Sequence, residues 1–546
     1  MSRTPIMERP RPTRLIPSIA QPRFQGPWLL LVALLLLGAV LRWVNLGDNS
    51  LGYDEGFTWW VAGQAPLRII RIIQQDTWPP LYYLIMHAWM GIWGDSEFAM
   101  RSQSALASTL TMIVGAVLAW RIFPSRGARL LAVGLLAVSA MQLEFAQTVR
   151  CYATASLLVL LTLLAIIRRV EGAGRHWNIL YIISAAALVY QHNVMWFYLA
   201  SLHITWLIWP GKQSLRQRVW EMVLTDTAVA LLFAPWAPSL LGQFRHVDKA
   251  FWVGRPAFYD LSFVASGLSG MVLPVLSEAA NAIGVHDSSY RLIRLSAFGL
   301  IGLVISASLI ATPRLMRRRL LGLLACGVGP VLLVFVYSRF RQSIFIDRVF
   351  TPTSAVMPLI FAAVAMIVVP YWRRIAVTAT AAMLILMGTS TALLYSKPPV
   401  EPWREAMTSV QQKRQPGDLV LFFACEGELI YDYYAARQGW EPMATGGVPV
   451  DFRSNDPPRV QLRVDNDADL TPLIKRLNDP AVGRVFLVNA HVGWIDRDSL
   501  VARYFEDNWY TDEVVEWTPI TISTYSRQSG MSSAPAGTNA IGTSFP

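Results

Sequence analysis

The sequence is poor in charge: only 15% of its 546 residues are Asp, Glu, Lys or Arg, where a soluble chain carries about 25%. Apolar residues make up 54% and collect in runs such as residues 28–41, 130–143 and 157–167. These features exclude a single soluble domain, a disordered chain and a fibrous repeat. We therefore expect a membrane protein, much of whose surface faces lipid.

Cysteines and common cofactor motifs are scarce as well. Cys151, Cys326 and Cys425 lie far apart and form no CxxC pair, so neither a disulfide framework nor a zinc site is expected. The sequence has no Walker loop, no glycine-rich dinucleotide motif and no HExxH. These absences exclude nucleotide-driven pumping by this chain. We expect no resident cofactor or metal ligand set, and a divalent cation stays an open alternative.

Basic residues alternate with the apolar runs. Eleven segments are apolar enough to be spans, from about 27–46 to about 375–395. The nine between them lie near 97–121, 129–145, 153–168, 177–192, 194–209, 219–240, 291–312, 320–338 and 349–369. A basic arm at 1–26 and every second loop together carry 20 Lys or Arg residues and three acidic residues. By the positive-inside rule these segments are cytoplasmic, and the alternate loops face outward.

The net charge of +11 is therefore mainly a signal of topology, and no nucleic-acid partner is expected. Two outer segments, 47–96 and 241–290, are long. The first contains short amphipathic stretches, which favour helices lying in the membrane interface; an additional pair of short spans is the alternative. Asp226 lies within a span, where we expect it to hydrogen-bond a neighbouring helix.

The composition changes after residue 395, and acidic residues outnumber basic ones in 396–526. Leu419–Phe423 and Arg484–Val488 are predicted strands, and 426–437 and 470–477 are predicted helices. Segment 396–526 is therefore a predicted extracytoplasmic α/β domain. The end of the chain, 527–546, is rich in Ser, Gly, Ala and Pro and is predicted to be disordered. The predicted fold is a polytopic α-helical membrane protein with a small outer α/β domain.

Asp54 and Glu55 are adjacent acids that open a predicted helix just outside the first span. Acidic residues at such a position are favoured by the helix dipole alone. A carboxylate there would also suit a general base, because a neighbouring like charge and partial desolvation raise its pKa. Spacing alone leaves both interpretations open.

Other motifs follow Asp54-Glu55 in a fixed order along the chain. They are 76–83 (DTWPPLYY), 94–101 (GDSEFAMR), 150–152 (RCY), 251–252 (FW), 347–348 (DR), 402–404 (PWR) and 416–418 (PGD). The series resembles the GT-C type glycosyltransferases that use polyprenyl-phosphate sugars. The likeness is to bacterial relatives of protein O-mannosyltransferases, glycosyltransferase family 39, and of the lipid A aminoarabinose and galacturonic acid transferases. It covers about residues 27–440 and implies a GT-C transmembrane catalytic domain at 27–395.

The resemblance implies that Asp54 is the catalytic base and that Glu55 is its partner. It implies substrate-binding roles for a further set of residues: Asp76, Tyr82, Arg150, Tyr152, His192, Trp252, Arg255 and Arg348. Among these, the arginines suit a donor phosphate and Trp252 suits stacking on a sugar face. Taken alone, each of these arginines is more often a membrane-interface anchor, and most tryptophans of the chain belong to interface belts. Two positions depart from the family pattern: Trp78 replaces a frequent His or Lys, and Thr148 replaces a frequent Glu.

The expected function is transfer of a sugar from a polyprenyl-phosphate carrier to a hydroxyl of a lipid, glycan or protein. The expected location is the outer, periplasmic face of the bacterial inner membrane, and direct displacement would invert the anomeric centre. A lipid transporter or flippase, a non-catalytic scaffold and a ligase using polyprenyl-diphosphate donors are the alternatives. Acids at the outer rim and the lack of an internal repeat weigh against a transporter.

Overall fold

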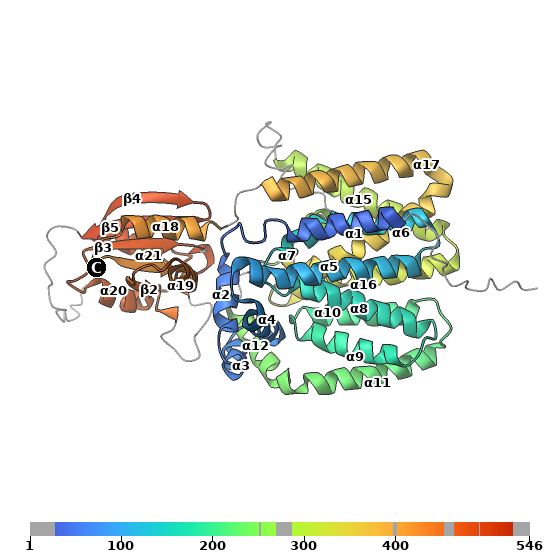
Figure 1. Ribbon diagram of the computed structural model, residues 1–546, viewed down its shortest axis with the longest axis horizontal. Coiled ribbons are helices and arrows are strands. Elements are labelled where there is room, and N and C mark those ends of the chain that lie inside the picture. Colours follow the sequence, from blue (N-terminus) through green and yellow to red (C-terminus); the bar gives the residue numbers. More distant parts are fainter. Residues whose placement is uncertain are drawn as a thin grey trace, which may run out of the picture.

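A bundle of roughly parallel helices forms the larger part of the structure, and a smaller α/β unit sits at one end of it (Figure 1). The structure is a computed structural model that describes residues 28–250, 253–268, 287–396, 401–452, 463–490 and 492–527. The predicted basic arm, Trp252 and residues 528–546 of the predicted disordered end lie outside these ranges. Arg527, the first residue of that predicted end, is the last residue of a strand.

The bundle consists of α1 (Trp28–Trp43), α5 (Glu97–Ile122), α6 (Arg126–Ala137), α7 (Ala140–Ala146), α8 (Tyr152–Val170), α9 (His176–Val189), α10 (Met195–Ile208), α11 (Leu215–Phe233), α15 (Asp287–Ala311), α16 (Arg314–Phe340) and α17 (Thr351–Ser396). The long α17 is kinked at a non-helical residue, Trp372, which divides it into two helical parts. The helices α6 and α7 are inclined at 47° to each other across a short break.

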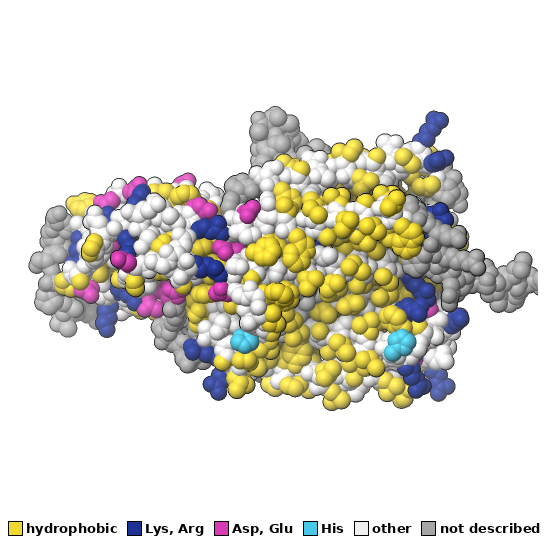
Figure 2. All heavy atoms as spheres, viewed as in Figure 1, with side chains coloured by type: hydrophobic (Ala, Val, Ile, Leu, Met, Phe, Trp, Pro, Cys, Tyr) yellow, Lys and Arg dark blue, Asp and Glu magenta, His cyan; other side chains and the backbone are white. Residues whose placement is uncertain are grey.

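Six segments of the described chain are long and apolar enough to cross a membrane, or seven if α6 and α7 form one bent span. The six are Glu97–Ile122, Tyr152–Val170, Leu215–Phe244, Arg314–Phe340, Asp347–Val369 and Trp372–Ser396. Four shorter apolar helices join them: Trp28–Trp43, His176–Val189, Met195–Ile208 and Phe298–Ala311. Each of these segments overlaps one of the eleven predicted spans. Figure 2 shows apolar side chains over the bundle and Lys and Arg at its end away from the α/β unit.

Small residues let the bundle helices pack closely, as is common where lipid supplies no hydrophobic drive. A Cβ added at Gly322 in α16 would lie 2.6 Å from the ring of Trp209, directly after α10. Polar contacts also join the helices. The Tyr181 hydroxyl in α9 donates to Asp226 in α11 at 2.6 Å, and His203 in α10 lies 3.2 Å from the same oxygen. The predicted pairing of Asp226 with neighbouring helices is confirmed.

Short helices cover the end of the bundle that faces the α/β unit (Figure 1). They are α2 (Tyr53–Ala62), α3 (Pro66–Gln75) and α4 (Leu81–Trp93) from the first long loop, and α12 (Ala237–Ala250), which follows η1 (Ala234–Trp236) and runs into the second long loop. That loop also contains α13 (Phe258–Leu268). Because α2, α3 and α4 lie across the end of the bundle and not alongside its helices (Figure 1), their arrangement favours the interfacial prediction over an additional pair of spans.

The α/β unit contains α18 (Trp403–Lys413), β1 (Leu419–Phe423), α19 (Gly427–Gln438), β2 (Ala444–Gly447), η4 (Asp467–Leu470), α20 (Thr471–Leu477), β3 (Arg484–Asn489), η5 (Val492–Trp494), α21 (Leu500–Asn508), β4 (Trp509–Trp517) and β5 (Ile520–Arg527). The strand order is β2-β1-β3-β5-β4. Strand β1 runs parallel to β2 and β3, whereas β5 is antiparallel to β3 and β4. The strands β1 and β3 match the two predicted strands, and the β4–β5 hairpin was not predicted.

Replacing Gly322 with Leu is expected to lower the melting temperature in detergent, because the new side chain must displace the Trp209 ring. Overpacking of this kind costs about 1–3 kcal/mol. Gly388 in α17 is the matched control, since a Cβ there meets no atom within 4 Å. Thermal unfolding of the two Gly→Leu variants measures the difference, and equal melting temperatures would contradict close packing at Gly322.

Candidate active site

A cavity of about 910 Å³ opens at the end of the bundle that faces the α/β unit. Its walls come from the start of α2, the connection between α3 and α4, the start of α8, the turn between α9 and α10, and the short helix η2 (Asp347–Phe350). Glu401 and Glu426 line it from the α/β unit side. Segments from both parts of the structure therefore enclose one space.

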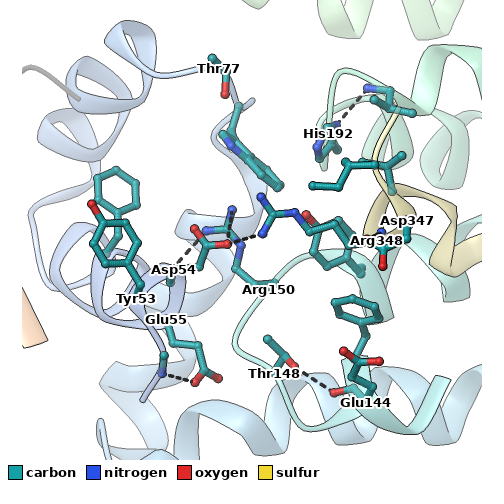
Figure 3. A pocket seen from close by; sticks show the side chains of 18 of the residues that line it. Tyr53, Asp54, Glu55, Thr77, Glu144, Thr148, Arg150, His192, Asp347 and Arg348 are labelled. Atoms are coloured by element: carbon teal, nitrogen blue, oxygen red, sulfur yellow. Dashed lines mark hydrogen bonds and ion pairs between the residues drawn. The ribbon is translucent and has the colours of Figure 1, made fainter. Parts of the chain in front are cut away.

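Asp54 lies in the first turn of α2 and points into this cavity (Figure 3). Its carboxylate is 39% exposed and receives two guanidinium groups at the same oxygen. Arg348 Nη1 lies 2.7 Å from Oδ2, and Arg150 Nη2 lies 3.9 Å from it. An acid and two arginines from three distant parts of the sequence thus meet at one point.

Arg150 is held in place by an aromatic side chain. Its guanidinium lies 4.2 Å from the centre of the Trp78 ring, a cation–π contact. Its Nη1 also lies 3.4 Å from the backbone oxygen of Asp54 and from the hydroxyl of Thr58. Trp78 occupies the position where relatives often have His or Lys. In this chain the ring at that position orients Arg150.

Glu55 differs from Asp54 in its surroundings, although the two are adjacent. Its side chain is 7% exposed and forms a two-pronged ion pair with Arg101, at 3.1 and 2.7 Å. Its oxygens also accept the backbone N–H groups of Gly52, at 2.9 Å, and Val149, at 2.7 Å. Each oxygen therefore accepts two hydrogen bonds, which uses the accepting capacity of the carboxylate.

Asp76 lines the cavity but is only 6% exposed. It accepts the N–H of Thr77 at 2.7 Å. Burial raises the pKa of its carboxyl from 3.8 to about 6, against the opposing effect of this hydrogen bond and of Arg150. A carboxyl with such a pKa changes its charge near neutral pH.

His192 and Tyr152 belong to the aromatic wall around Trp78. The His192 ring lies 4.2 Å and the Tyr152 ring 6.1 Å from the Trp78 ring, centre to centre. His192 Nδ1 accepts the N–H of Val194 at 3.0 Å, so the proton of the neutral ring is on Nε2. The Tyr152 hydroxyl is buried and has no hydrogen-bond partner in the described part of the chain.

Seven of the ten predicted site residues therefore line one cavity: Asp54, Glu55, Asp76, Arg150, Tyr152, His192 and Arg348. Tyr82 and Arg255 do not line it. Tyr82 is buried beside Tyr83, with ring centres 6.1 Å apart, and Arg255 is exposed before α13. Trp252 lies outside the described residues.

The acidic side chains of the cavity that sequence reasoning missed include Glu144, Glu401 and Glu426. A signal for Glu144 was present, because relatives often carry Glu at the position of Thr148. Glu144 lies one helical turn earlier, and the Thr148 hydroxyl donates to its backbone oxygen at 2.9 Å. No local signal marked the other two. Within the described ranges no three His, Cys, Asp or Glu side chains gather in a way that would hold a metal ion.

Residues 77–238 match the family model of the dolichyl-phosphate-mannose-protein mannosyltransferases. Over these residues the chain is similar to the GT-C glycosyltransferases. The predicted resemblance is thereby confirmed, and the matched segment contains Arg150, Tyr152 and His192. No curated protein matches the chain in sequence.

Solved GT-C structures resemble the chain loosely. ArnT from Cupriavidus metallidurans in the apo state is 14% identical, with a TM-score of 0.47, over 91% of this chain and 97% of that one. The same enzyme bound to undecaprenyl phosphate is 13% identical, with a TM-score of 0.44, over 93% of this chain and 100% of that one. The arabinofuranosyltransferase AftD from Mycobacteria is 15% identical, with a TM-score of 0.46, over 93% of this chain and 42% of that one.

The Asp76→Asn variant tests the burial of this carboxyl. The Asp76 carboxyl binds its proton more tightly in the folded protein than in the unfolded chain. Its titration therefore makes folding less favourable as pH rises from about 4 to about 6. Asn does not titrate, so the variant should gain stability over the natural protein as pH rises, by up to about 3 kcal/mol above pH 6. Melting curves in detergent between pH 4.5 and 7.5 measure the gain. The same gain in Asp347→Asn, an exposed acid of the same cavity, would contradict burial as the cause.

Proposed function

We propose that this protein transfers a sugar from a polyprenyl-phosphate donor to a hydroxyl of a lipid, glycan or protein acceptor. The proposed site is the cavity, on the outer face of the bacterial cytoplasmic membrane. The observation that carries the proposal is the convergence of Asp54, Arg150 and Arg348 on this one space. The family match over residues 77–238 supports the type of donor.

The proposed topology has eleven spans. It counts α6 and α7 as one bent span, the two parts of α17 as two spans, and the four shorter apolar helices as one span each. The cavity lies at the end of the bundle next to the α/β unit. Lys and Arg side chains gather at the opposite end of the bundle (Figure 2). By the positive-inside rule that basic end is cytoplasmic, so the cavity faces outward. An odd number of spans also leaves the α/β unit outside.

The charges of the cavity fit a direct displacement. In the described state Arg348 is paired with Asp54 at 2.7 Å. A donor phosphate would compete for the guanidinium groups of Arg348 and Arg150, because both bind phosphate oxygens as well as carboxylates. The Asp54 carboxylate would then be available to a hydroxyl of the acceptor. The arginines thus keep the base paired until the donor arrives.

In the proposed reaction the acceptor oxygen attacks the anomeric carbon of the donor sugar while Asp54 takes the hydroxyl proton. The bond between the anomeric carbon and the phosphate oxygen breaks, and its electron pair stays on the phosphate. The products are the glycoside, polyprenyl phosphate and protonated Asp54. Attack opposite to the leaving group inverts the anomeric configuration. The phosphate needs no proton to leave, because Arg150 and Arg348 stabilise its added charge.

Glu55 and the aromatic wall take supporting roles in this proposal. Each oxygen of Glu55 already accepts two hydrogen bonds, and these bonds position α2 and the segment of chain before Arg150. Trp78 orients Arg150 and, with His192 and Tyr152, gives the sugar a flat apolar surface. Asp76 borders this wall and is suited to accept a hydrogen bond from a sugar hydroxyl.

The Asp54→Asn variant should reduce product by more than about 100-fold, because the amide keeps the shape but cannot take the proton. The product is identified as the mass lost from envelope lipids and glycans when the gene is deleted, and it is then quantified in strains carrying each variant. Asp465→Asn, the same change on an exposed side chain of the α/β unit, is the control. Full product in the Asp54→Asn strain would refute the assignment of the base.

The Arg348→Ala variant should bind undecaprenyl phosphate roughly ten- to 100-fold more weakly, as expected for loss of a charge-assisted phosphate contact. Binding to the purified protein in detergent measures this effect without knowledge of the sugar. Arg463→Ala, which removes an arginine from an exposed ion pair of the α/β unit, is the control. Unchanged affinity in Arg348→Ala would exclude Arg348 as a phosphate ligand.

A further inference from the structure

The helix that carries Asp54 begins without a side-chain cap of its own. The residue at the cap position is Gly52, and the first turn of α2 presents backbone N–H groups that need acceptors. Such a position normally has Ser, Thr, Asp or Asn, whose side chain accepts one of these groups. Glu55 satisfies the N–H of Gly52 at 2.9 Å. The N–H of Tyr53, the residue before Asp54, must find its acceptor elsewhere.

That acceptor comes from the beginning of the α/β unit, 348 residues further along the chain. Glu401 Oε2 accepts the Tyr53 N–H at 2.6 Å. The same oxygen accepts the indole N–H of Trp403 at 2.9 Å, and Trp403 is 1% exposed in the core of the unit. The Glu401 backbone oxygen also accepts the Ser50 hydroxyl at 2.7 Å. A carboxylate fixed to the α/β unit thus caps the helix of Asp54, where its charge suits the helix dipole.

The chain leading into α2 is held from the same side. The N–H of Leu51 donates to the Tyr434 hydroxyl at 2.7 Å. Arg404 donates to the backbone oxygen of Asp48 at 3.0 Å and pairs with Glu97 at 2.9 Å. The Tyr53 hydroxyl, at the start of α2, donates to Glu426. The backbone on the N-terminal side of Asp54 therefore rests on the α/β unit.

The other face of α2 packs directly on α19. A Cβ added at Gly56 would lie 2.4 Å from Ile430 Cγ1, and only 3.6 Å from its Cβ. The glycine lets the two helices approach at this point. Phe452 adds edge contacts with Phe57 and Trp60, with ring centres 6.2 and 5.2 Å apart. Polar and apolar contacts both tie the position of α2 to the α/β unit.

We propose that the α/β unit positions the base of the reaction, and that Glu401 is a positioning residue which sets the direction of the first turn of α2. The inference rests on the proposed function of Asp54. A base must lie within hydrogen-bond reach of the acceptor hydroxyl. Displacement by about 1 Å costs on the order of 100-fold in rate. Arg348 comes from η2 and Arg150 from the residues just before α8, so the backbone positions of the donor-binding arginines do not depend on this cap.

The experiment uses the full chain and compares Glu401→Ala with Glu401→Gln. Alanine removes the cap, whereas the Gln carbonyl still accepts the Tyr53 N–H. Product per cell should fall about tenfold or more in Glu401→Ala and stay within about threefold in Glu401→Gln. Glu513→Ala is the matched control, because Glu513 belongs to an exposed ion pair with Lys413 in the same unit. Undecaprenyl phosphate should bind purified Glu401→Ala within about twofold of the natural protein.

A compensating pair tests the packing side of the proposal. Gly56→Ala should reduce product about tenfold, because its Cβ overlaps Ile430 and displaces α2. Combining it with Ile430→Ala removes the overlapping Cγ1 and leaves the Ile430 Cβ position at ordinary contact distance. The double variant should recover product to within about threefold of Ile430→Ala alone. Undecaprenyl phosphate binding to purified Gly56→Ala distinguishes a displaced α2, which keeps the donor site, from a protein that failed to fold, which loses it.

The outcomes separate this inference from the proposed function. Natural product levels in Glu401→Ala, or no recovery in the double variant, would overturn the positioning role even if Asp54→Asn is inactive. Loss of undecaprenyl phosphate binding in Glu401→Ala would also overturn it, because the cap would then support the whole cavity. Full activity of Asp54→Asn would instead refute the proposed function itself.

Discussion

The buried ion pair between Glu55 and Arg101 is the interaction on which the geometry of the cavity depends. Arg101 also donates to the backbone oxygens of Leu46, Asn49 and Ser50, so it organises the whole approach to α2. Glu55 in turn accepts the N–H of Val149, the residue before Arg150. One pair therefore fixes the distance between the helix of Asp54 and the start of α8. A buried pair of this kind is tolerated only when every polar atom is satisfied, and here each carboxylate oxygen is.

Two adjacent acids take opposite environments for a simple geometric reason. Successive residues of a helix point about 100° apart, so the side chain that follows a cavity-facing one turns into the protein. The Asp54 side chain keeps 39% exposure, while that of Glu55 keeps 7%. The sequence predicted that an acid would sit at this place, but it did not separate the exposed acid from the buried one. That separation requires knowledge of Arg101, 46 residues away.

The parts of the structure that hydropathy and charge control were predictable. Lipid demands apolar helices and the positive-inside rule orders their ends, so the apolar helices overlap the predicted segments. The strand β1 was predictable for a similar reason, because a short apolar run between turn residues favours a buried β-strand. The β4–β5 hairpin was missed because most of β4 is exposed and polar, so its sequence lacks an apolar alternation. Glu401 and Glu426 were missed because their partners are more than 300 residues away.

The cavity lies between the apolar helix bundle and the polar α/β unit. In the proposed reaction a lipid-linked donor would reach it from the bundle, where aromatic and apolar walls surround two arginines. A hydroxyl acceptor would reach it from outside, where the walls are the polar chain before α2 and the acids of the α/β unit. The proposed direct displacement places the acceptor oxygen and the leaving phosphate on opposite sides of the anomeric carbon, so the base must keep a fixed position relative to both parts of the structure. The contacts of α2 meet this requirement, because Arg101 anchors it to α5 in the bundle and Glu401 anchors it to the α/β unit.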